Sequence, residues 1–337
     1  MIAAYQIESG IYGDTRMKAI LQDRYGPPDV LHLEDIAVPV ARADEVLVRV
    51  LAASAFIGDW HVATGLPYAI RAVSGIRAPK NHVRGQDFAG RVESVGANVT
   101  GLYPGDEVFG TCLGSFAEMA RTEPDKIAPK PANLDFKRSA TVPTTGSTAL
   151  QGLRDVGRVQ AGERVLIIGA AGGVGSFAVQ IAKAFGAHVT GVCSPTKVDL
   201  VRSIGADDVI DYTRDDFAEM GQRYDVILDT AGNRSVSHLR RALAPRGRLV
   251  IGGGEGGGRW FGVGRQIRAS MLSPFVSQRL GTFITKQNRD DLLVLKELVE
   301  AGKVTPVIGS TYPLREVPDA IRRLGEGHGR GKVVIEI

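Results

Sequence analysis

Residues 164–186 of this 337-residue chain read RVLIIGAAGGVGSFAVQIAKAFG, which joins an apolar run, a glycine-rich loop and a second apolar segment. The five residues before the first glycine have the length and composition of a buried strand. After the loop, apolar residues recur at helical spacing from Val174 to Phe185, and Gly186 ends that helix. The 18 uncharged residues from 165 to 182 include four glycines, so a strand, a loop and a helix describe them better than a membrane span.

The loop GAAGGVG at residues 169–175 has the composition of a phosphate-binding turn. A diphosphate needs close approach to the backbone, which side chains would block, and a helix N-terminus favours its negative charge. No Lys-Ser/Thr pair follows the glycines, which disfavours a Walker-type nucleotide loop. In preference to a purely structural tight turn, we predict a dinucleotide site with the loop residues Gly169, Ala171, Gly172, Gly173, Val174 and Gly175.

The segment after the next strand indicates which dinucleotide binds. An NAD-specific site places Asp or Glu at the end of the second strand, where it binds the ribose hydroxyls. Residues 189–198 read VTGVCSPTKV and contain no acid before Asp199. Because Ser194, Thr196 and Lys197 can instead donate to a ribose phosphate, we expect NADPH. The alternative for Lys197 is an ordinary solvated residue in the first turn of a helix.

The same alternation of strands and helices continues beyond the loop. Apolar runs predict strands at 188–192, 208–211, 224–228 and 248–251, and helical spacing predicts helices at 197–204 and 235–243. This alternation is typical of a parallel sheet wound with helices on both faces.

The two ends of the chain have a different pattern. The first third contains short β-runs separated by Gly and Pro, such as 44–51 and 88–95, which is typical of a small irregular barrel. Near the C-terminus we predict a helix over 289–301 and a final strand over 332–337. Between 252 and 264, eight of thirteen residues are Gly, which fits a surface loop or a mobile segment beside the site.

Composition indicates a globular protein, because 44% of the residues are hydrophobic, 23% are charged and only two are Cys. The length suggests two domains. The net charge of +4 is spread along the chain, so a nucleic-acid partner is not expected. Cys112 and Cys193 form neither a CxxC pair nor a zinc pattern and fit a reducing compartment, so we expect a cytoplasmic protein. The first 16 residues resemble neither a secretory signal nor a membrane anchor.

Several motifs, in order along the chain, resemble those of the medium-chain dehydrogenase/reductase superfamily. They are GQDFAGRV at 85–92, GDEVFG at 105–110, GSTAL at 146–150, GADDVIDY at 205–212, DTAG at 229–232 and GKVV at 331–334, besides the glycine loop. The resemblance implies an α/β protein in which a GroES-like, β-rich catalytic domain is interrupted by a Rossmann domain, a doubly wound parallel sheet. We expect an N-terminal extension at 1–16, the catalytic domain at 17–137, the NADP-binding domain at 138–277 and the catalytic return at 278–337.

The resemblance also distinguishes a zinc-dependent branch from a zinc-free one. Where the zinc branch has its three catalytic ligands, this sequence has Phe56, Gln86 and Thr144, and none of them is an ordinary zinc ligand. The four structural cysteines of the zinc branch are also absent, and His61 and Cys112 lack the spacing of another metal site. We therefore expect no metal. The chain resembles the zinc-independent quinone oxidoreductase group, which is zeta-crystallin-like.

This resemblance implies an NADPH-dependent, cytoplasmic homodimer that transfers hydride to quinones or α,β-unsaturated carbonyl compounds, with no membrane partner. The protein would supply alignment, exclusion of water and hydrogen bonding, and an obligatory acid is not needed. Two alternatives stay open, an enoyl-thioester reductase and an NADPH-binding structural protein without turnover.

The substrate pocket is expected around Phe56, His61 and Tyr68. His61 and Tyr68 could each donate to a carbonyl oxygen, or each could be a structural residue. Asp59 is expected to cap the adjoining helix rather than act as a base. Tyr212 and Lys332 are expected near the adenosine phosphate, or each could be a solvated surface residue. By resemblance, the remaining cofactor contacts are Thr148, Thr230, Ala231 and Gly252.

Overall fold

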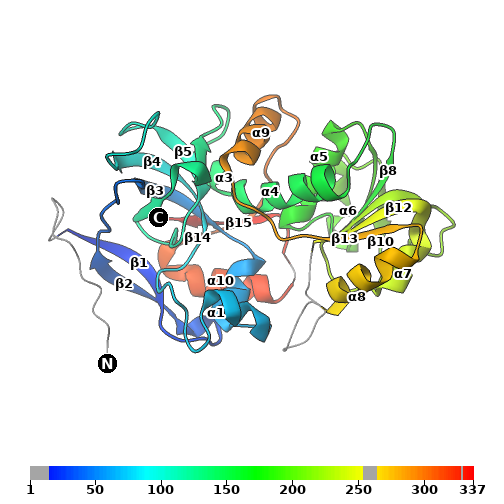
Figure 1. Cartoon of the computed structure of the whole chain (residues 1–337), viewed down its shortest axis with the longest axis horizontal. Helices are drawn as coiled ribbons and strands as arrows, with labels where there is room; N and C mark the ends of the chain where they lie inside the picture. Colours follow the sequence, from blue (N-terminus) through cyan, green and yellow to red (C-terminus); the bar gives the residue numbers. More distant parts are fainter. Residues whose placement is uncertain (1–14, 253–263, 328) are drawn as a thin grey trace.

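Two large β-sheets form the framework of the protein, one in each half of the molecule (Figure 1). The computed structural model describes residues 15–252, 264–327 and 329–337. One half contains a largely antiparallel sheet with short helices, and the other contains a parallel sheet between layers of helices. The predicted α/β class, with a β-rich part and a doubly wound parallel sheet, is therefore confirmed.

The parallel sheet has six strands in the order β10-β9-β8-β11-β12-β13. Their bounds are β8 Arg164–Ile168, β9 His188–Cys193, β10 Asp208–Asp211, β11 Tyr224–Asp229, β12 Leu243–Ile251 and β13 Arg279–Thr282. The helices of this half are α5 Gly173–Ala184, α6 Val198–Ser203, α7 Val236–Ala242 and α8 Gly264–Leu272.

Helices cover this sheet on both faces, and β8 shows why. Val165 and Ile167 belong to the apolar cluster that contains Phe177 of α5. Leu166 and Ile168 belong to the cluster on the opposite face, which contains residues of α7 and α8. Since successive side chains of a strand point to opposite faces, a strand covered on both sides reads as an unbroken apolar run.

The strand order reverses at β8, which lies between β9 and β11. In open parallel sheets, ligands bind in the crevice outside the carboxyl ends of the strands at this reversal. The glycine loop follows β8 directly and leads into α5, so the topology places the loop at this crevice.

The other sheet has seven strands, six of them in the order β14-β15-β3-β4-β5-β7, with β6 also paired to β3. A separate hairpin of β1 and β2 lies beside it. The strands are β1 Arg16–Gln22, β2 Leu31–Ala37, β3 Val46–Ala55, β4 Asp87–Val95, β5 Glu107–Thr111, β6 Met119–Thr122, β7 Ile127–Pro129, β14 Ile308–Pro313 and β15 Lys332–Glu336. The helices are α1 Ile57–Thr64, α2 Arg71–Ser74, α3 Phe136–Ala140, α9 Arg289–Glu300 and α10 Val317–Gly325.

Two segments connect the halves. The helix α4, Pro143–Gln151, leads out of the antiparallel half, and residues 283–288 return to it from β13 (Figure 1). The C-terminal strand β15 then pairs antiparallel with β3, with Val333 opposite Ala55. This pairing places Lys332 beside Phe56, although the two are far apart in the sequence.

Some expected boundaries differ in the structure. The helix expected over 197–204 begins with a short 3₁₀ turn, Pro195–Lys197, because Pro195 suits the first position of a helical turn. The strand expected at 248–251 begins five residues earlier, at Leu243. The domain boundary expected at 277 lies before β13, whose backbone pairs with β12 of the parallel sheet. Most of the expected extension at 1–16 and nearly all of the glycine-rich segment at 252–264 lie outside the described residues.

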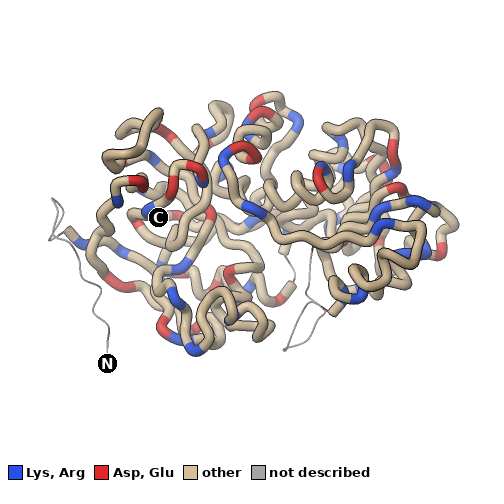
Figure 2. Tube along the Cα trace, viewed as in Figure 1, with Lys and Arg blue, Asp and Glu red and all other residues tan. Residues whose placement is uncertain are grey.

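Charges of both signs are interspersed over both halves of the molecule, as Figure 2 shows. In the described parts of the chain, no helix is long and apolar enough to cross a membrane. Residues 165–182 form the strand, loop and helix that the glycines predicted.

Candidate functional site

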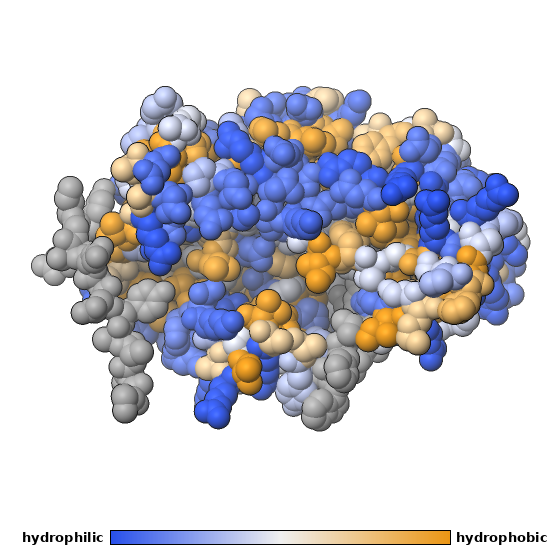
Figure 3. All heavy atoms as spheres, in the orientation of Figure 1, coloured by the Kyte–Doolittle hydropathy of each residue, from blue (hydrophilic) through white to orange (hydrophobic). Residues whose placement is uncertain are grey.

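A cavity of about 650 Å³ lies between the two halves, and both contribute to its walls. We call it the central cavity. Phe56, His61 and Gln86 line it from the antiparallel half, and the glycine loop lines it from the parallel half. Residues 284, 285 and 287 of the returning segment complete it. In the space-filling view, hydrophilic residues form a broad band across the upper half of this face, and separate hydrophobic patches lie below it (Figure 3).

In the glycine loop, the backbone at the N-terminus of α5 is not covered by side chains of the loop. Gly172 caps the helix without any side-chain hydrogen bond, so the first N–H groups of α5 are available to an anion. A Cβ on Gly169 would lie 2.7 Å from Thr230 Oγ1, and one on Gly173 would lie 3.3 Å from Lys332 Cδ. Side chains would therefore fill this cradle, and a dinucleotide diphosphate fits it.

The loop residues divide by role. All those expected to contact the cofactor line the cavity except Gly175. A Cβ on Gly175 would lie 2.0 Å from the carbonyl oxygen of Gly169. Gly175 therefore allows α5 to pack closely on the loop, which is a structural contribution to the site.

The expected adenosine end lies at the carboxyl end of β9. Ser194, Lys197 and Tyr212 line the cavity, whereas Thr196 is exposed and does not. Lys197 is half-buried, and its Nζ donates to the carbonyl oxygen of Gly329 at 2.7 Å. Burial lowers the pKa of Lys197, and the nearby Arg330 lowers it further. Lys197 thus lies at the cavity wall, where its ammonium is hydrogen-bonded, rather than on a solvated helix face.

Lys332, which we expected near the adenosine phosphate, lines the cavity beside Asp87 and Phe56. The antiparallel pairing of β15 with β3 brings its Nζ to 3.7 Å from Asp87 Oδ2 and to 5.6 Å from the centroid of the Phe56 ring. Both charged groups are buried, with Lys332 1% and Asp87 0% exposed. Burial raises the pKa of Asp87 to about 6 and lowers that of Lys332. The sequence does not reveal this buried pair, because Asp87 and Lys332 are far apart along the chain.

Asp59 caps α1, as expected, because its Oδ2 accepts a hydrogen bond from the backbone N–H of Phe56 at 2.9 Å. Burial raises the pKa of Asp59 to about 7, and the neighbouring Asp87 contributes to the shift. The carboxylate thus holds the backbone of a residue that lines the cavity.

Of the other expected substrate residues, His61 lines the cavity and Tyr68 does not. The Nδ1 atom of His61 lies 2.7 Å from the carbonyl oxygen of Leu66, which only accepts, so Nδ1 carries the proton. Burial lowers the pKa of His61, and the Nε2 atom of its neutral ring is an acceptor. Neutral His61 therefore cannot donate to a carbonyl oxygen through Nε2. The ring of Tyr68 is partly exposed and lies 4.8 Å from the Arg71 guanidinium.

Gln86 and Thr144 are hydrogen-bonded to each other at the cavity wall. Gln86 Nε2 donates to Thr144 Oγ1 at 3.3 Å, and the Thr144 hydroxyl and backbone N–H both donate to Asp87 Oδ1. Sequence reasoning placed Gln86 and Thr144 only as replacements of zinc ligands. Within the described residues, no three His, Cys, Asp or Glu side chains lie together as a metal site.

A loop after β11 forms the opposite wall. Asp229 is buried, and its Oδ1 accepts from the backbone N–H groups of Ala231 and Gly232, each at 3.1 Å. Its other oxygen pairs with Arg265 of α8. These contacts fix the turn whose residues Thr230 and Ala231 line the cavity, together with Gly252.

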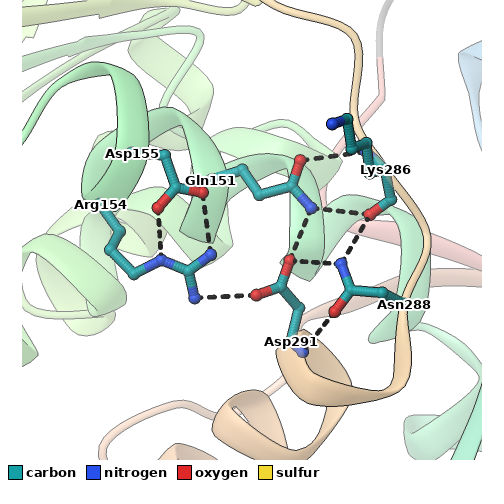
Figure 4. Close-up of polar contacts among 6 residues, drawn as sticks. All are labelled: Gln151, Arg154, Asp155, Lys286, Asn288 and Asp291. Carbon is teal, nitrogen blue, oxygen red and sulfur yellow. Dashed lines mark hydrogen bonds and ion pairs between the residues drawn. The ribbon is translucent and has the colours of Figure 1, made fainter.

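The returning segment is fixed by Gln151 at the end of α4. Its amide pairs with the backbone of Lys286, as Oε1 accepts from the N–H at 3.0 Å and Nε2 donates to the carbonyl at 2.7 Å. Gln151 Nε2 also donates to Asp291, which pairs with Arg154 at 2.8 Å (Figure 4). One residue earlier, the Thr285 hydroxyl lies 2.8 Å from that of Thr148, another expected cofactor contact. The polar network therefore sets the position of one cavity wall.

Comparison with known proteins connects this arrangement to two family models. The alcohol dehydrogenase GroES-like domain matches residues 42–132, and the zinc-binding dehydrogenase domain matches residues 204–335. Together they cover parts of both halves of the structure.

Individual relatives match most of the chain. A 2-methylene-furan-3-one reductase of Solanum lycopersicum is 34% identical, and the match covers 99% of this chain and 82% of that protein. A chloroplastic NADPH-dependent alkenal/one oxidoreductase of Arabidopsis thaliana is 34% identical over 95% of this chain and 79% of its own length. The solved quinone oxidoreductase of Coxiella burnetii has a TM-score of 0.84 at 30% identity, covering 96% of this chain and 100% of that one.

Proposed function

The chain belongs to the medium-chain dehydrogenase/reductase family and is an oxidoreductase, and we propose that it transfers hydride from NADPH to quinones or α,β-unsaturated carbonyl compounds without a metal ion. The observation that carries the proposal is the central cavity, which combines a diphosphate cradle with an acceptor side formed by Phe56, Gln86 and Thr144. By the family resemblance, these are the three positions that hold zinc in the metal-dependent branch. Their side chains are an aromatic ring, an amide and a hydroxyl that is already hydrogen-bonded, none an ordinary zinc ligand.

A nicotinamide cofactor, when bound, supplies the hydride. Gly169, Gly172 and Gly173 would hold its diphosphate at the N-terminus of α5. The residues that would border its nicotinamide end are Thr148, Thr230, Ala231 and Gly252. The chain's own contribution is to align the reactants and to limit the access of water between walls supplied by both halves.

The choice of NADPH is supported by the absence of an acid at the end of β9 and by the groups that replace it. Ser194, Lys197 and Tyr212 line the cavity there, and Arg330 lies close enough to lower the pKa of Lys197. Two cations at one end of a dinucleotide site favour a ribose phosphate. The Arabidopsis relative is itself named as NADPH-dependent.

A quinone or enone acceptor suits a site without a metal ion. Its oxygen gains charge during the reaction but does not become a simple alkoxide that requires a Lewis acid. Relatives named as an alkenal/one oxidoreductase and a quinone oxidoreductase support this class. The enoyl-thioester reductase and the NADPH-binding structural protein become outcomes of the test below.

We further propose a homodimer. Strand β13 lies at an edge of the parallel sheet as described, and the apolar side chains of Phe275 and Ile284 on either side of it are 85% and 91% exposed. An open strand edge beside exposed apolar residues favours pairing with a second copy. Sedimentation equilibrium should give twice the chain mass of 35.9 kDa, and a monomer at micromolar concentration would contradict this proposal.

The expectations of a cytoplasmic location and of no nucleic-acid partner stay predictions. Fractionation of cells with an antibody against the chain tests the first, and a chain found only in an organelle would contradict it. A gel-shift assay with duplex DNA at physiological salt tests the second, and a defined complex would contradict it.

The test of the proposed activity is oxidation of NADPH by purified protein in the presence of a metal chelator. The acceptor panel is an ortho-quinone, a para-quinone, a linear enone and an enoyl thioester, and a simple alcohol is tested with oxidised cofactor. We expect chelator-resistant turnover of a quinone or enone. Chelator-sensitive alcohol oxidation would overturn the metal-free proposal, turnover of the thioester alone would favour the enoyl-thioester reductase, and binding without turnover would favour a structural role.

A further inference from the structure

We propose that the side-chain amide of Gln86 donates a hydrogen bond to the carbonyl oxygen of the acceptor and stabilises the charge that develops there. This inference deepens the proposed function and rests on it. It assigns to Gln86 an electrostatic role at a position where the metal-dependent branch of the family has a zinc ligand.

The backbone holds Gln86 firmly at the cavity wall. Gln86 immediately precedes β4, and its carbonyl oxygen accepts from the N–H of Cys112 at 2.9 Å. Its side chain lines the cavity with Phe56 and His61, opposite the loop that follows β11.

A chain of hydrogen bonds fixes the orientation of the amide. The Thr144 hydroxyl has one hydrogen, and it is donated to the Asp87 carboxylate. Thr144 Oγ1 therefore offers a lone pair to Gln86, so the atom that faces it at 3.3 Å must be the NH₂ group. Asp87 also accepts a hydrogen bond from the backbone N–H of Thr144. By fixing the Thr144 hydroxyl, Asp87 sets the direction of the Gln86 donor.

This arrangement leaves Gln86 with a second N–H for a ligand. An amide NH₂ has two donors, and one is directed at Thr144. A donor held by neighbouring groups before the substrate arrives costs little reorganisation during the reaction.

Neighbouring groups are less suited to the same task. Neutral His61 presents an acceptor, because its Nδ1 hydrogen is bound to Leu66. The Thr148 hydroxyl donates to the carbonyl oxygen of Thr144 at 2.7 Å. Lys332 is buried, and its Nζ lies 3.7 Å from Asp87 Oδ2, so its ammonium is paired with that carboxylate. Gln287 is another amide donor on the wall, and the experiment must separate it from Gln86.

The proposed step balances without any proton from Gln86. Hydride addition forms a C–H bond at the β-carbon of an enone, and the π electrons of the alkene move to the carbonyl oxygen. The resulting enolate then takes a proton from water, so the acceptor gains one hydride, which carries the two electrons, and one proton. Gln86 stays neutral throughout and donates a hydrogen bond that strengthens as charge builds on the oxygen.

The test compares Gln86→Met, which keeps the length of the side chain and removes its donors, with Gln287→Met and with Gln160→Met at an exposed position outside the cavity. The first readout is steady-state reduction of cyclohex-2-enone. Loss of one donor at a developing oxyanion lowers kcat by about 100-fold, and we expect this for Gln86→Met with an unchanged KM for NADPH. Thr144→Val, which removes the orienting acceptor, should lower kcat by roughly tenfold.

The second readout does not depend on turnover. The infrared carbonyl band of ¹³C-labelled cyclohex-2-enone is measured on the protein loaded with oxidised cofactor. In the parent protein and in the control variant Gln160→Met the band should lie at the lower frequency of a hydrogen-bonded carbonyl, and in Gln86→Met it should move toward the value in an apolar solvent.

The outcomes separate this inference from the proposed function. If the parent protein reduces the enone but Gln86→Met retains kcat within about threefold and leaves the band in place, the inference is wrong and the function stands. A band shift in Gln287→Met instead would assign the donor to Gln287 and overturn the inference. If the parent protein reduces no acceptor, the proposed function fails, whatever the band shows. If Gln86→Met does not fold, Thr144→Val decides by the same two readouts.

Discussion

At the residue scale, the proposed preference for NADPH rests on Lys197. Its Nζ donates to the carbonyl oxygen of Gly329, and Arg330 is close enough to lower its pKa. The missing acid after β9 could be recognised in the sequence, and so could Lys197. Arg330 and Gly329 could not, because they come from a segment more than 130 residues away and reach this site only through the return of β15 to the antiparallel sheet.

Replacing Lys197 by Glu should therefore weaken the binding of NADPH far more than the binding of NADH. The change removes a cation and places a carboxylate beside the expected ribose phosphate. Loss of a charge-assisted hydrogen bond corresponds to a rise in KM for NADPH of about 10- to 100-fold. Steady-state kinetics with both cofactors measure the effect, and NADH serves as the internal control for damage to the fold. An unchanged preference between the cofactors would remove Lys197 from the account of specificity.

Asp59 carries a buried charge whose cost depends on pH. Its pKa is raised by burial from 3.8 to about 7, so the folded state holds the proton more tightly than the unfolded state. Stability contributed by this group is present at low pH and is lost as pH rises toward 7, with the full penalty above that value.

Asp59→Asn should remove this penalty and retain the cap, since the amide oxygen can still accept from the N–H of Phe56. We expect the Tm of the variant, relative to the parent, to rise between about pH 5 and about pH 8. Thermal unfolding at the two pH values checks this, with Asp44→Asn at an exposed position as the control. A difference that stays constant or falls with pH would show that Asp59 does not ionise as described.

At the scale of elements, the strand, loop and helix of residues 164–186 were predicted nearly as they stand. Their apolar periodicity and glycine punctuation are local properties, which a sequence carries directly. The extra turn Pro195–Lys197 and the early start of β12 depend on local geometry and sheet pairing that periodicity alone does not specify.

The entry to α5 can be tested by charge at constant size, because Asn and Asp have the same shape. A Cβ on Gly172 would lie 3.3 Å from the carbonyl oxygen of Gly169, so Gly172→Asn should weaken NADPH binding only through its bulk. Gly172→Asp places a carboxylate where the diphosphate is expected and should weaken binding by more than about 100-fold. Fluorescence titration of NADPH compares the two. Equal losses in both variants would indicate a steric rather than an electrostatic role for this glycine.

The returning segment, residues 283–288, is the element whose position the sequence did not reveal. The sequence gives no sign that Gln151 has a special role. In the structure its amide donates to the carbonyl and accepts from the N–H of Lys286, as a neighbouring strand would (Figure 4). That contact holds the cavity wall formed by Ile284 and Thr285.

Gln151→Met should leave the N–H and carbonyl of Lys286 and the Asp291 carboxylate without a partner amide. An unsatisfied buried group costs about 1–3 kcal/mol, and of the three groups only the Asp291 carboxylate is buried, so we expect a loss of about 2 kcal/mol in the free energy of unfolding, with a higher KM for the acceptor. Urea unfolding and steady-state kinetics measure these effects, and Gln160→Met is the matched control. Parent-like stability and KM would mean that the segment is held by other contacts.

At the scale of the whole molecule, the α/β class and the pairing of a GroES-like domain with a Rossmann domain followed from ordered motifs along the chain. The crevice at the reversal of strand order is where topology alone leads us to expect the cofactor. The acceptor side was harder to predict. Its contacts form only where β15, β4 and α4 converge, so the sequence pattern of each element does not reveal them. The residues involved are Lys332, Asp87, Thr144 and Gln86.

The central claim is that this chain moves hydride from a nicotinamide to carbon without a metal ion. Its most direct measurement uses chelator-treated protein, NADPH that carries deuterium at the transferable position, and an α,β-unsaturated ketone in ordinary water. We predict, by NMR of the saturated product, deuterium at the β-carbon and solvent hydrogen at the α-carbon. Deuterium at the carbonyl carbon, or reaction only after zinc is restored, would contradict the account.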